Sequence, residues 1–446
     1  MALKHYGAAQ LDYNAAILIN PQYCDAYTER GVLFENFYFD PKRSSKDYYK
    51  AISLTSISDT KALSILYSDV AGDEFNMGNI DSALNLATIA IHFNPTNAIA
   101  YISRAGIYMS LTAYTRAIDD LNLAINYYSG SDKKELSKWY CNRADTKTMN
   151  KQLKDAINDY SFAVKLDSNN CKAYWNRANA YYQHGDYQLA IKDYAVAINF
   201  QTFDKDYNSI YLSNLYDSKA KCEIGANLLD DAIKDELDAI NVHKEIGKNY
   251  VDLGMAYTLK GDFEKAIHQS LISEQHISNT MATSYIYTLV ANNQYMLKKY
   301  KKALAYCDTA TFWNANDEDA YYYRAKVYLK MNNKEKAMSD FNTYIQLNNE
   351  KHTINYFFSL YYTGKGEDAI NLLKQTILNT TDDVQVMRYY YNLACLYSLM
   401  NNVDEANKYL KLSIDKGYSK KYASVDMDLD NIRNTSDYKI TVSSHR

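Results

Sequence analysis

The chain of 446 residues repeats one pattern of small and aromatic residues in a constant register. The segment 173–197 shows the pattern most clearly, as two amphipathic stretches on either side of Gly185. The pattern residues are Tyr174, Ala178, Tyr181, Ala190, Tyr194 and Ala197. Their spacings of three, four and seven place each set of three on one helix face. The small residue in each set lets two helices approach closely, and the aromatic residues fill the adjoining grooves.

Two positions of this pattern hold small residues in nearly every copy. With Tyr174 counted as position 4, position 8 is occupied by Gly31, Ala71, Ala105, Ala144, Ala178, Ala220, Gly254, Ala291, Ala325, Phe357 and Ala394. Position 20 is occupied by Ser44, Ala83, Ala117, Ala156, Ala190, Ala232, Ala266, Ala303, Ala337, Ala369 and Ala406. The register therefore holds through eleven copies, of which the first and the tenth are the weakest.

The pattern resembles the tetratricopeptide repeat, a helix-turn-helix unit of 34 residues. The resemblance implies an all-α fold, a right-handed superhelical solenoid of about eleven tetratricopeptide repeats with a C-terminal cap of the bacterial type. The composition agrees, because 3 Pro and 14 Gly are too few for a β protein, which needs turn residues at every hairpin.

The steps between copies alternate, so the repeating unit spans two copies. Position 4 is Tyr67, Tyr101, Tyr140 and Tyr174 in the second to fifth copies, and the intervals between them alternate between long and short. The extra residues fall in segments such as 128–138 and 200–214. Because Pro and Gly are scarce, we expect longer second helices in these segments and no irregular loops.

The two ends predict a division into three parts. Residues 1–22 fit the second helix of a repeat, with Ala9, Tyr13 and Ala16 at positions 20, 24 and 27. They predict either an N-terminal cap or a repeat truncated at its first helix. Residues 23–415 form the repeat array, and residues 416–446 form a polar C-terminal cap and tail, which shields the apolar face of the last repeat. An uncapped N-terminal helix would permit self-association.

A stripe of basic residues at position 7 is interpreted as structural. The stripe consists of Arg30, Arg104, Arg143, Arg177, Lys219 and Arg324. The same six copies carry Asp at position 23, as Asp47, Asp120, Asp159, Asp193, Asp235 and Asp340, and the other five copies have neither residue. The matched occurrence predicts an ion pair between the two helices of each such repeat, and not a surface for acidic ligands or RNA.

The sequence contains no arrangement of residues typical of an enzyme. There is no metal-binding His pair, no Gly-rich phosphate loop and no Gly-x-Ser-x-Gly motif, and the acidic run 426–430 is too short for a calcium loop. We therefore predict no catalytic residue, no metal and no cofactor. The 49 basic and 53 acidic residues give a net charge of −4, which disfavours nucleic acid, and no apolar run could span a membrane. Six widely spaced cysteines favour free thiols and the cytoplasm.

The resemblance implies that positions 2, 5, 9, 12 and 13 of the first helices line a concave groove. In the centre of the array, the candidate partner-binding residues are Asp145, Lys172, Trp175, Asn179, Tyr182, Asp217 and Lys221. Trp175 is either an anchor for a partner or an ordinary surface aromatic residue. The carboxylate clamp of chaperone-binding members is not assembled here, because repeat four has Cys141 and Asp145 at positions 5 and 9, where that clamp needs Lys and Asn.

These observations predict a non-enzymatic scaffold that binds a protein or peptide partner in the groove. The alternative is the sensory or regulatory region of a larger protein whose effector domain lies upstream of residue 1.

Overall fold

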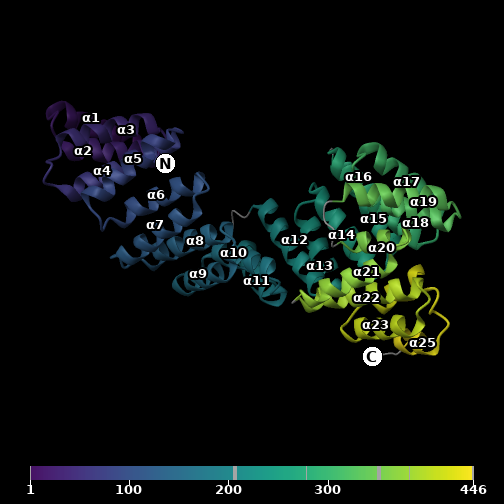
Figure 1. Cartoon of the computed structure of the whole chain (residues 1–446). Coiled ribbons are helices and arrows are strands. Elements are labelled where there is room, and N and C mark those ends of the chain that lie inside the picture. The colour runs from purple at the N-terminus through teal and green to yellow at the C-terminus, as the bar shows by residue number, and fades with distance from the viewer. Residues whose placement is uncertain (1, 204–207, 278, 349–352, 381, 444–446) are drawn as a thin grey trace. The chain divides into compact units, whose positions relative to one another are not determined.

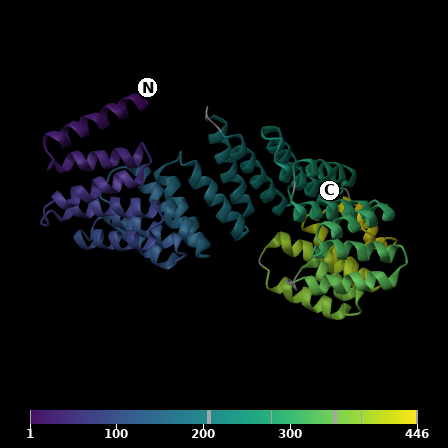
Figure 2. The same ribbon diagram turned by 90° about the horizontal axis from the view of Figure 1, so that it is seen from above.

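The computed structural model describes the chain except residues 1, 204–207, 278, 349–352, 381 and 444–446. The described residues form 25 α-helices and two 3-10 helices, and they contain no strand. Consecutive helices pack against one another in pairs (Figures 1 and 2). The predicted all-α solenoid of helical pairs is confirmed.

The chain divides into two compact units, Met1–His184 and Gly185–Arg446. Unit 1 contains α1 (Ala2–Ile19), α2 (Cys24–Asn36), α3 (Pro41–Leu54), α4 (Thr60–Asn76), α5 (Ile80–Phe93), α6 (Ala98–Ser110), α7 (Tyr114–Tyr127), α8 (Lys133–Met149), α9 (Leu153–Leu166) and α10 (Cys171–His184). Repeats one to four are the pairs from α2–α3 to α8–α9, and α10 is the first helix of repeat five.

Unit 2 begins with the second helix of repeat five and ends with the C-terminal segment. Its helices are α11 (Tyr187–Phe203), α12 (Ser209–Gly225), α13 (Leu229–Val242), α14 (Gly247–Lys260), α15 (Phe263–Ser273), η1 (Glu274–His276), α16 (Thr280–Met296), α17 (Tyr300–Trp313), α18 (Glu318–Lys330), α19 (Lys334–Leu347), α20 (Ile354–Tyr362), α21 (Gly366–Leu378), α22 (Asp383–Leu399), α23 (Val403–Asp415), α24 (Lys420–Val425), η2 (Met427–Leu429) and α25 (Ser436–Ser443). Repeats six to eleven are the pairs from α12–α13 to α22–α23.

The small residues of the pattern lie where the helices of a pair meet. All ten alanines at position 20 have no exposed surface, and those at position 8 are at most 1% exposed. Gly31 shows why the residue must be small, because a Cβ atom there would lie 2.7 Å from the ring of Tyr48. Close packing thus explains the register found in the sequence.

The expected lengthening of second helices is only partly correct. Helix α11 does extend to Phe203, but α7 ends at Tyr127, and a turn separates it from α8. The local sequence Ser-Gly-Ser-Asp at 129–132 supports that turn, and Asp132 caps α8 by accepting hydrogen bonds from the backbone of Lys134 and Glu135. The extra residues there lengthen the first helix of the following repeat instead.

Helix α1 occupies the place of a second helix. It packs on α2, and Asn14 accepts a hydrogen bond from Arg30 Nη1 at 2.7 Å. Asn14 is at position 25, and the same position in repeats two, three, four and eight also accepts a bond from the arginine of the next repeat.

The assignment of 1–22, 23–415 and 416–446 as separate parts stays a prediction.

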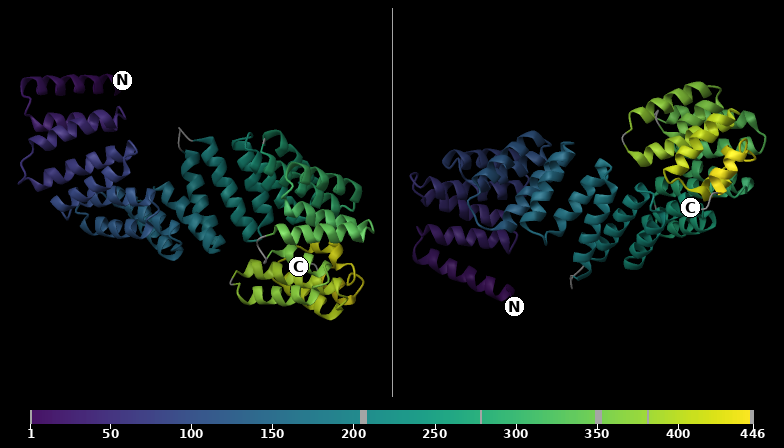
Figure 3. Two further views of the ribbon diagram at one scale, coloured as in Figure 1. Left: turned by 45° about the horizontal axis from the view of Figure 1, so that its top comes forward. Right: turned by 90° about the horizontal axis from the view of Figure 1, so that it is seen from below.

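The C-terminal segment 416–433 packs in two directions within unit 2. Within this segment α24 contacts α14 and η2 contacts α22, whereas α25, which follows the segment, covers α23 as a cap does. Lys421 pairs with Asp262, and the side chain of Asn227 donates a hydrogen bond to the carbonyl of Gly417. The segment therefore reaches back to repeats six and seven of its own unit, and Figure 3 shows it in yellow against the green helices.

Candidate binding surface

The basic stripe at position 7 is bound internally. Arg104 donates two hydrogen bonds of 2.8 Å to Asp120, from Nε and Nη2, and the same paired geometry joins Arg30 to Asp47, Arg143 to Asp159 and Arg324 to Asp340. Lys219 pairs with Asp235. Five of the six predicted ion pairs are thus confirmed. Arg177 and Asp193 belong to different units, so the sixth stays a prediction.

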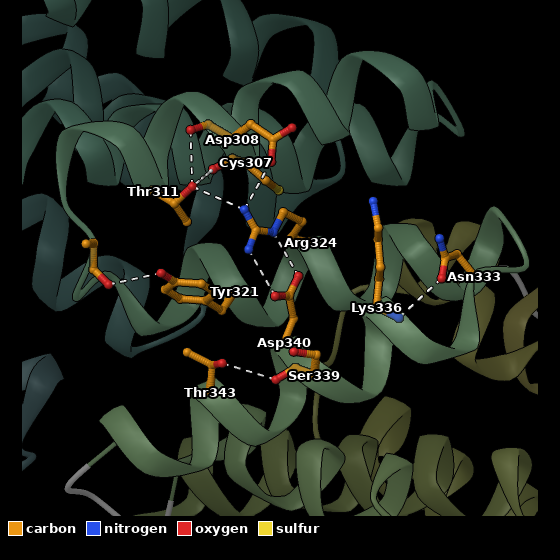
Figure 4. A network of polar contacts seen from close by, with 11 residues as sticks. Cys307, Asp308, Thr311, Tyr321, Arg324, Asn333, Lys336, Ser339, Asp340 and Thr343 are labelled. Atoms are coloured by element: carbon orange, nitrogen blue, oxygen red, sulfur yellow. Dashed lines mark hydrogen bonds and ion pairs between the residues drawn. The ribbon is translucent and has the colours of Figure 1, made fainter.

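Each arginine of the stripe also contacts the preceding repeat. Arg324 donates from Nη1 to Asp308 at 3.0 Å, so that one side chain joins three helices (Figure 4). The hydrogen bonds with Asp340, followed by the attraction of its charge, raise the pKa of Arg324. The stripe therefore stabilises the stacking of repeats.

In unit 1, α10 carries four of the candidate residues on one face. Lys172, Trp175, Asn179 and Tyr182 follow at steps of three, four and three along the helix. Tyr182 is 41% exposed and Trp175 is half-buried. The ammonium of Lys172 lies 3.6 Å from Asp145 on α8, which also accepts hydrogen bonds from Tyr160 and Asn176. These five candidate residues therefore belong to two neighbouring first helices.

In unit 2, the candidates Asp217 and Lys221 belong to a group of four alternating charges. Lys221 contacts Asp217 at 2.7 Å and Asp252 at 3.2 Å, and Lys248 contacts the same two carboxylates at 2.8 and 3.2 Å. Burial acts to raise the pKa of Asp217, but the two ammonium groups hold it below its ordinary value. The charges of this group compensate one another, so it has no excess charge of one sign for a ligand.

A third carboxylate, Glu236, lies beneath this group. It has no exposed surface, and burial raises its pKa well above the ordinary value. Asp217, Glu236 and Asp252 bring one oxygen each within 4.8 Å of one another, which is close enough for a metal ion. Lys221 and Lys248 already serve as the cationic partners of the two aspartates, so the group is complete as an ion-pair cluster.

The candidate residues thus form two sets, one in each unit.

The groove positions of repeats nine to eleven were not among the candidates predicted from the sequence. Lys326, at position 9, is 9% exposed, and its ammonium lies 2.7 Å from Asp428 in the C-terminal segment. Tyr391, at position 5, donates to Asp426 at 2.7 Å. The acidic run 426–430 could have predicted these contacts from the sequence. Its aspartates at 426 and 428 need cationic or hydroxyl partners if they are buried.

Among the described residues, no helix combines the length and the apolar character needed to cross a membrane.

Comparison with known proteins agrees with the geometry of the helical pairs. Models described as tetratricopeptide repeat match residues 172–201, 319–348 and 388–415, and a model described as TPR repeat matches residues 148–185. Helical-repeat proteins of this kind build an extended binding surface from stacked pairs. These segments of the chain are therefore tetratricopeptide repeats, and proteins with such repeats generally mediate protein–protein interactions.

The curated relatives are similar over part of their length. "Tetratricopeptide repeat protein 6" of Homo sapiens is 27% identical over 187 residues, which cover 42% of this chain and 34% of that protein. "TPR repeat-containing thioredoxin TDX" of Arabidopsis thaliana is 36% identical over 90 residues, which cover 20% of this chain and 22% of that protein. "Serine/threonine-protein phosphatase 5" of Rattus norvegicus is 31% identical over 99 residues, covering 22% and 19%. The chain thus spans about a third or less of these relatives.

Among solved structures, one described as "Crystal structure of MamA protein" is 19% identical and has a TM-score of 0.37. The similarity covers 42% of this chain and 94% of that one.

The repeat fold is generally non-enzymatic, although one relative is by its name a phosphatase.

Proposed function

We propose that the chain is a non-enzymatic scaffold that binds an extended segment of a protein partner in the concave groove, along the face of α10 that carries the predicted groove residues. The observation that carries this proposal is the common face of Lys172, Trp175, Asn179 and Tyr182. Aromatic rings supply apolar contact area with a polar edge, and an asparagine amide can pair with a peptide backbone whatever its side chains. Arg177 on the same helix donates to Ser161 at 3.1 Å and has a structural role.

The charge arrangement supports a partner without strong net charge. Lys172 and Asp145 lie 3.6 Å apart and carry opposite charges. A ligand of one sign would be attracted by one of them and repelled by the other. This disfavours nucleic acid and favours a protein segment of mixed composition.

The test is affinity capture from a native lysate with the wild type and with the double variant Trp175→Ala/Tyr182→Ala. We expect the double variant to lose a partner that the wild type retains. Tyr49→Ala is the matched control, because Tyr49 on α3 is 44% exposed, close to the 41% of Tyr182. A partner retained by the double variant would exclude α10 as the binding surface.

The exposed face of α1 supports a second mode of binding, the pairing of two copies of this chain. Ala8, Leu11, Ala15 and Leu18 are exposed and follow at steps of three, four and three, the spacing of a helix that packs along a second helix. Leu11 is 68% exposed and Leu18 is 84% exposed. We expect sedimentation analysis to show concentration-dependent dimers that Leu11→Glu/Leu18→Glu abolishes. Leu378→Glu, at a leucine also 84% exposed, should leave the dimers unchanged.

We also propose a cytoplasmic location, which rests on the buried thiols of Cys141, Cys222, Cys307 and Cys395. Maleimide labelling of the unfolded, unreduced protein from cells should modify all of them. The alternative function, a sensory region of a larger protein, stays a prediction.

A further inference from the structure

Unit 2 contains a cavity of about 320 Å³ that is partly open to solvent and uses none of the residues proposed for partner binding. Its walls are the first helices of repeats seven to eleven, closed on one side by the C-terminal segment 416–433. The lining combines aromatic rings with charged and amide side chains, and the tyrosines among them are Tyr322, Tyr323, Tyr391, Tyr418 and Tyr422. A volume of this size lies at the lower end of the range of small-molecule sites.

The lining contains two cations with different surroundings. Lys326 is paired with Asp428 at 2.7 Å. Arg388, at position 2 of repeat eleven, donates one hydrogen bond of 3.2 Å from Nη2 to the carbonyl of Ile224. Among the described residues, no Asp or Glu forms an ion pair with Arg388. One guanidinium at the cavity thus lacks a negative partner.

The carboxylates nearest to the cavity are already engaged. Asp428 holds Lys326, and Asp426 accepts hydrogen bonds from the hydroxyl of Tyr391 at 2.7 Å and from the backbone of Asp428 at 3.0 Å. Neither aspartate can turn to Arg388 without leaving a buried partner unsatisfied. Neither carboxylate of the lining is therefore available to the half-buried Arg388, and its charge is free to pair with a group from outside the chain.

Side-chain amides complete the polar part of the lining. Asn292 on α16, Asn355 on α20 and Asn392 on α22 face the cavity from three helices. Asn355 donates to Asp319 at 2.8 Å, and Asn392 donates to the carbonyl of Arg388 at 2.7 Å, which fixes both amides in place. Each retains an amide oxygen that can accept from a ligand.

We propose that this cavity binds a compact organic carboxylate, with Arg388 as its charge partner and the tyrosine rings as its walls. An arginine can hold a carboxylate through two parallel hydrogen bonds, and such charge-assisted bonds are strong. A neutral ligand would leave Arg388 uncompensated. The carboxylate comes either from a free small acid or from an acidic side chain of a bound peptide. Because the cavity lies in unit 2 and uses no residue of α10, this proposal is independent of the proposed scaffold function.

The test is isothermal titration of the full chain with three probes. Phenylacetate represents a free acid, 2-phenylethanol has the same ring without the charge, and acetyl-Ala-Glu-Ala-amide represents an acidic side chain of a peptide. We expect one of the acids to bind, and 2-phenylethanol to bind at least about tenfold more weakly than phenylacetate if the free acid is the ligand. Preference for phenylacetate assigns a free acid, and preference for the tripeptide assigns a peptide.

The variants then locate the bound acid. Arg388→Gln should weaken binding by about tenfold or more, whereas Arg388→Lys should retain part of it because the charge remains. Arg116→Gln is the matched control, since Arg116 is an exposed arginine on α7 in unit 1 and should leave binding unchanged. If the Arg388→Gln variant fails to fold, as judged by the loss of its helical circular dichroism signal, Leu259→Trp is used in its place. The larger side chain from α14 fills the cavity and leaves Arg388 unchanged. Absence of binding by both acids, or equal binding by the wild type and these variants, would overturn the proposal.

Discussion

The hydroxyl of Ser137 joins two consecutive repeats, because it donates to the carbonyl of Ala163 at 2.9 Å and accepts from the side-chain amide of Asn170 at 3.0 Å. Ser64 makes the equivalent contacts with Ala90 and Asn97, and Ser213 with Ala239 and Asn249. The serine is at position 1 of repeats two, four and six, and its amide partner lies just before the first helix of the next repeat or in the first turn of that helix. This contact gives the two-repeat period of the sequence a physical basis.

Replacing Ser137 by alanine should destabilise unit 1. Ser137 has no exposed surface, so the change leaves the carbonyl of Ala163 and the amide of Asn170 each without this buried partner. We expect a loss of about 1–3 kcal/mol in the free energy of unfolding. Urea denaturation followed by circular dichroism measures it. Ser53→Ala, at an exposed serine, should change the midpoint little, and equal midpoints for both variants would contradict the role of Ser137.

The sequence predicted the contacts that recur at a fixed spacing. Arg104 and Asp120 lie sixteen residues apart in neighbouring helices, and the same spacing or one residue more recurs in each pair of the stripe. Because repeat geometry copies such contacts, their matched occurrence among eleven copies was sufficient to infer them. The pair of Ser137 and Asn170 also recurs, but it joins one repeat to the next, and the distance between its residues changes from 33 to 36 in the pair of Ser213 and Asn249, so the matched spacing within repeats did not reveal it.

The pair of Arg104 and Asp120 should show strong coupling in a double-mutant cycle. Asp120 is 3% exposed, so Arg104→Ala leaves a buried carboxylate without its cation and should cost about 3–5 kcal/mol. Adding Asp120→Ala removes that uncompensated charge, so the double variant should lose less than the sum of the single variants. Denaturation midpoints of the four proteins give the coupling energy. Additive losses would refute the pairing.

The same cycle on Arg177 and Asp193 examines the sixth predicted pair. Arg177 is the last arginine of unit 1 and Asp193 lies in α11 of unit 2. We expect a coupling energy of the same sign as that of Arg104 and Asp120. Zero coupling would show that the sequence match at this repeat does not correspond to a contact.

The path of the C-terminal segment could not be predicted from local patterns. Lys326 and Asp428 are separated by 102 residues, and they meet because the curvature of several stacked repeats brings the last repeat back to the earlier ones of unit 2. Small rotations between neighbouring repeats accumulate over the array, and no residue pattern within one repeat reports their sum.

Breaking the pair of Lys326 and Asp428 should release the C-terminal segment. Lys326→Met leaves Asp428 buried without a cation and should cost about 3–5 kcal/mol, whereas Lys326→Met/Asp428→Asn should recover most of that loss. Amide hydrogen exchange should then be faster at residues 420–432 in the single variant than in the double one. Lys421→Met serves as the control, because the Lys421 side chain is 57% exposed and its pair with Asp262 should contribute under about 1 kcal/mol. Equal exchange in Lys326→Met and the wild type would contradict this role.

Unit 1 should lose stability as the pH rises toward 7. Burial, followed by the nearby charge of Glu35, raises the pKa of Asp69 to about 7, and burial is also the main cause that raises the pKa of Asp73 to about 7. The folded state therefore keeps protons that the unfolded chain releases above about pH 4. The free energy of unfolding should fall between about pH 4 and pH 7 and be level above that range. A pKa displaced from 3.8 to about 7 corresponds to roughly 4 kcal/mol for one isolated group.

Asparagine substitutions test whether Asp69 and Asp73, and not other titrating groups, cause this dependence of stability on pH. Asp69→Asn/Asp73→Asn should melt at a higher temperature than the wild type at pH 8, because the amides keep the polar shape of the protonated acids without a buried charge. At pH 4.5 the two proteins should melt at similar temperatures, since both aspartates of the wild type are then protonated. Asp25→Asn, at an exposed aspartate of α2, should leave the pH profile unchanged. Melting curves of the proteins at the two pH values measure this. If the melting temperature of the double variant changed with pH as much as that of the wild type, Asp69 and Asp73 would not hold these protons.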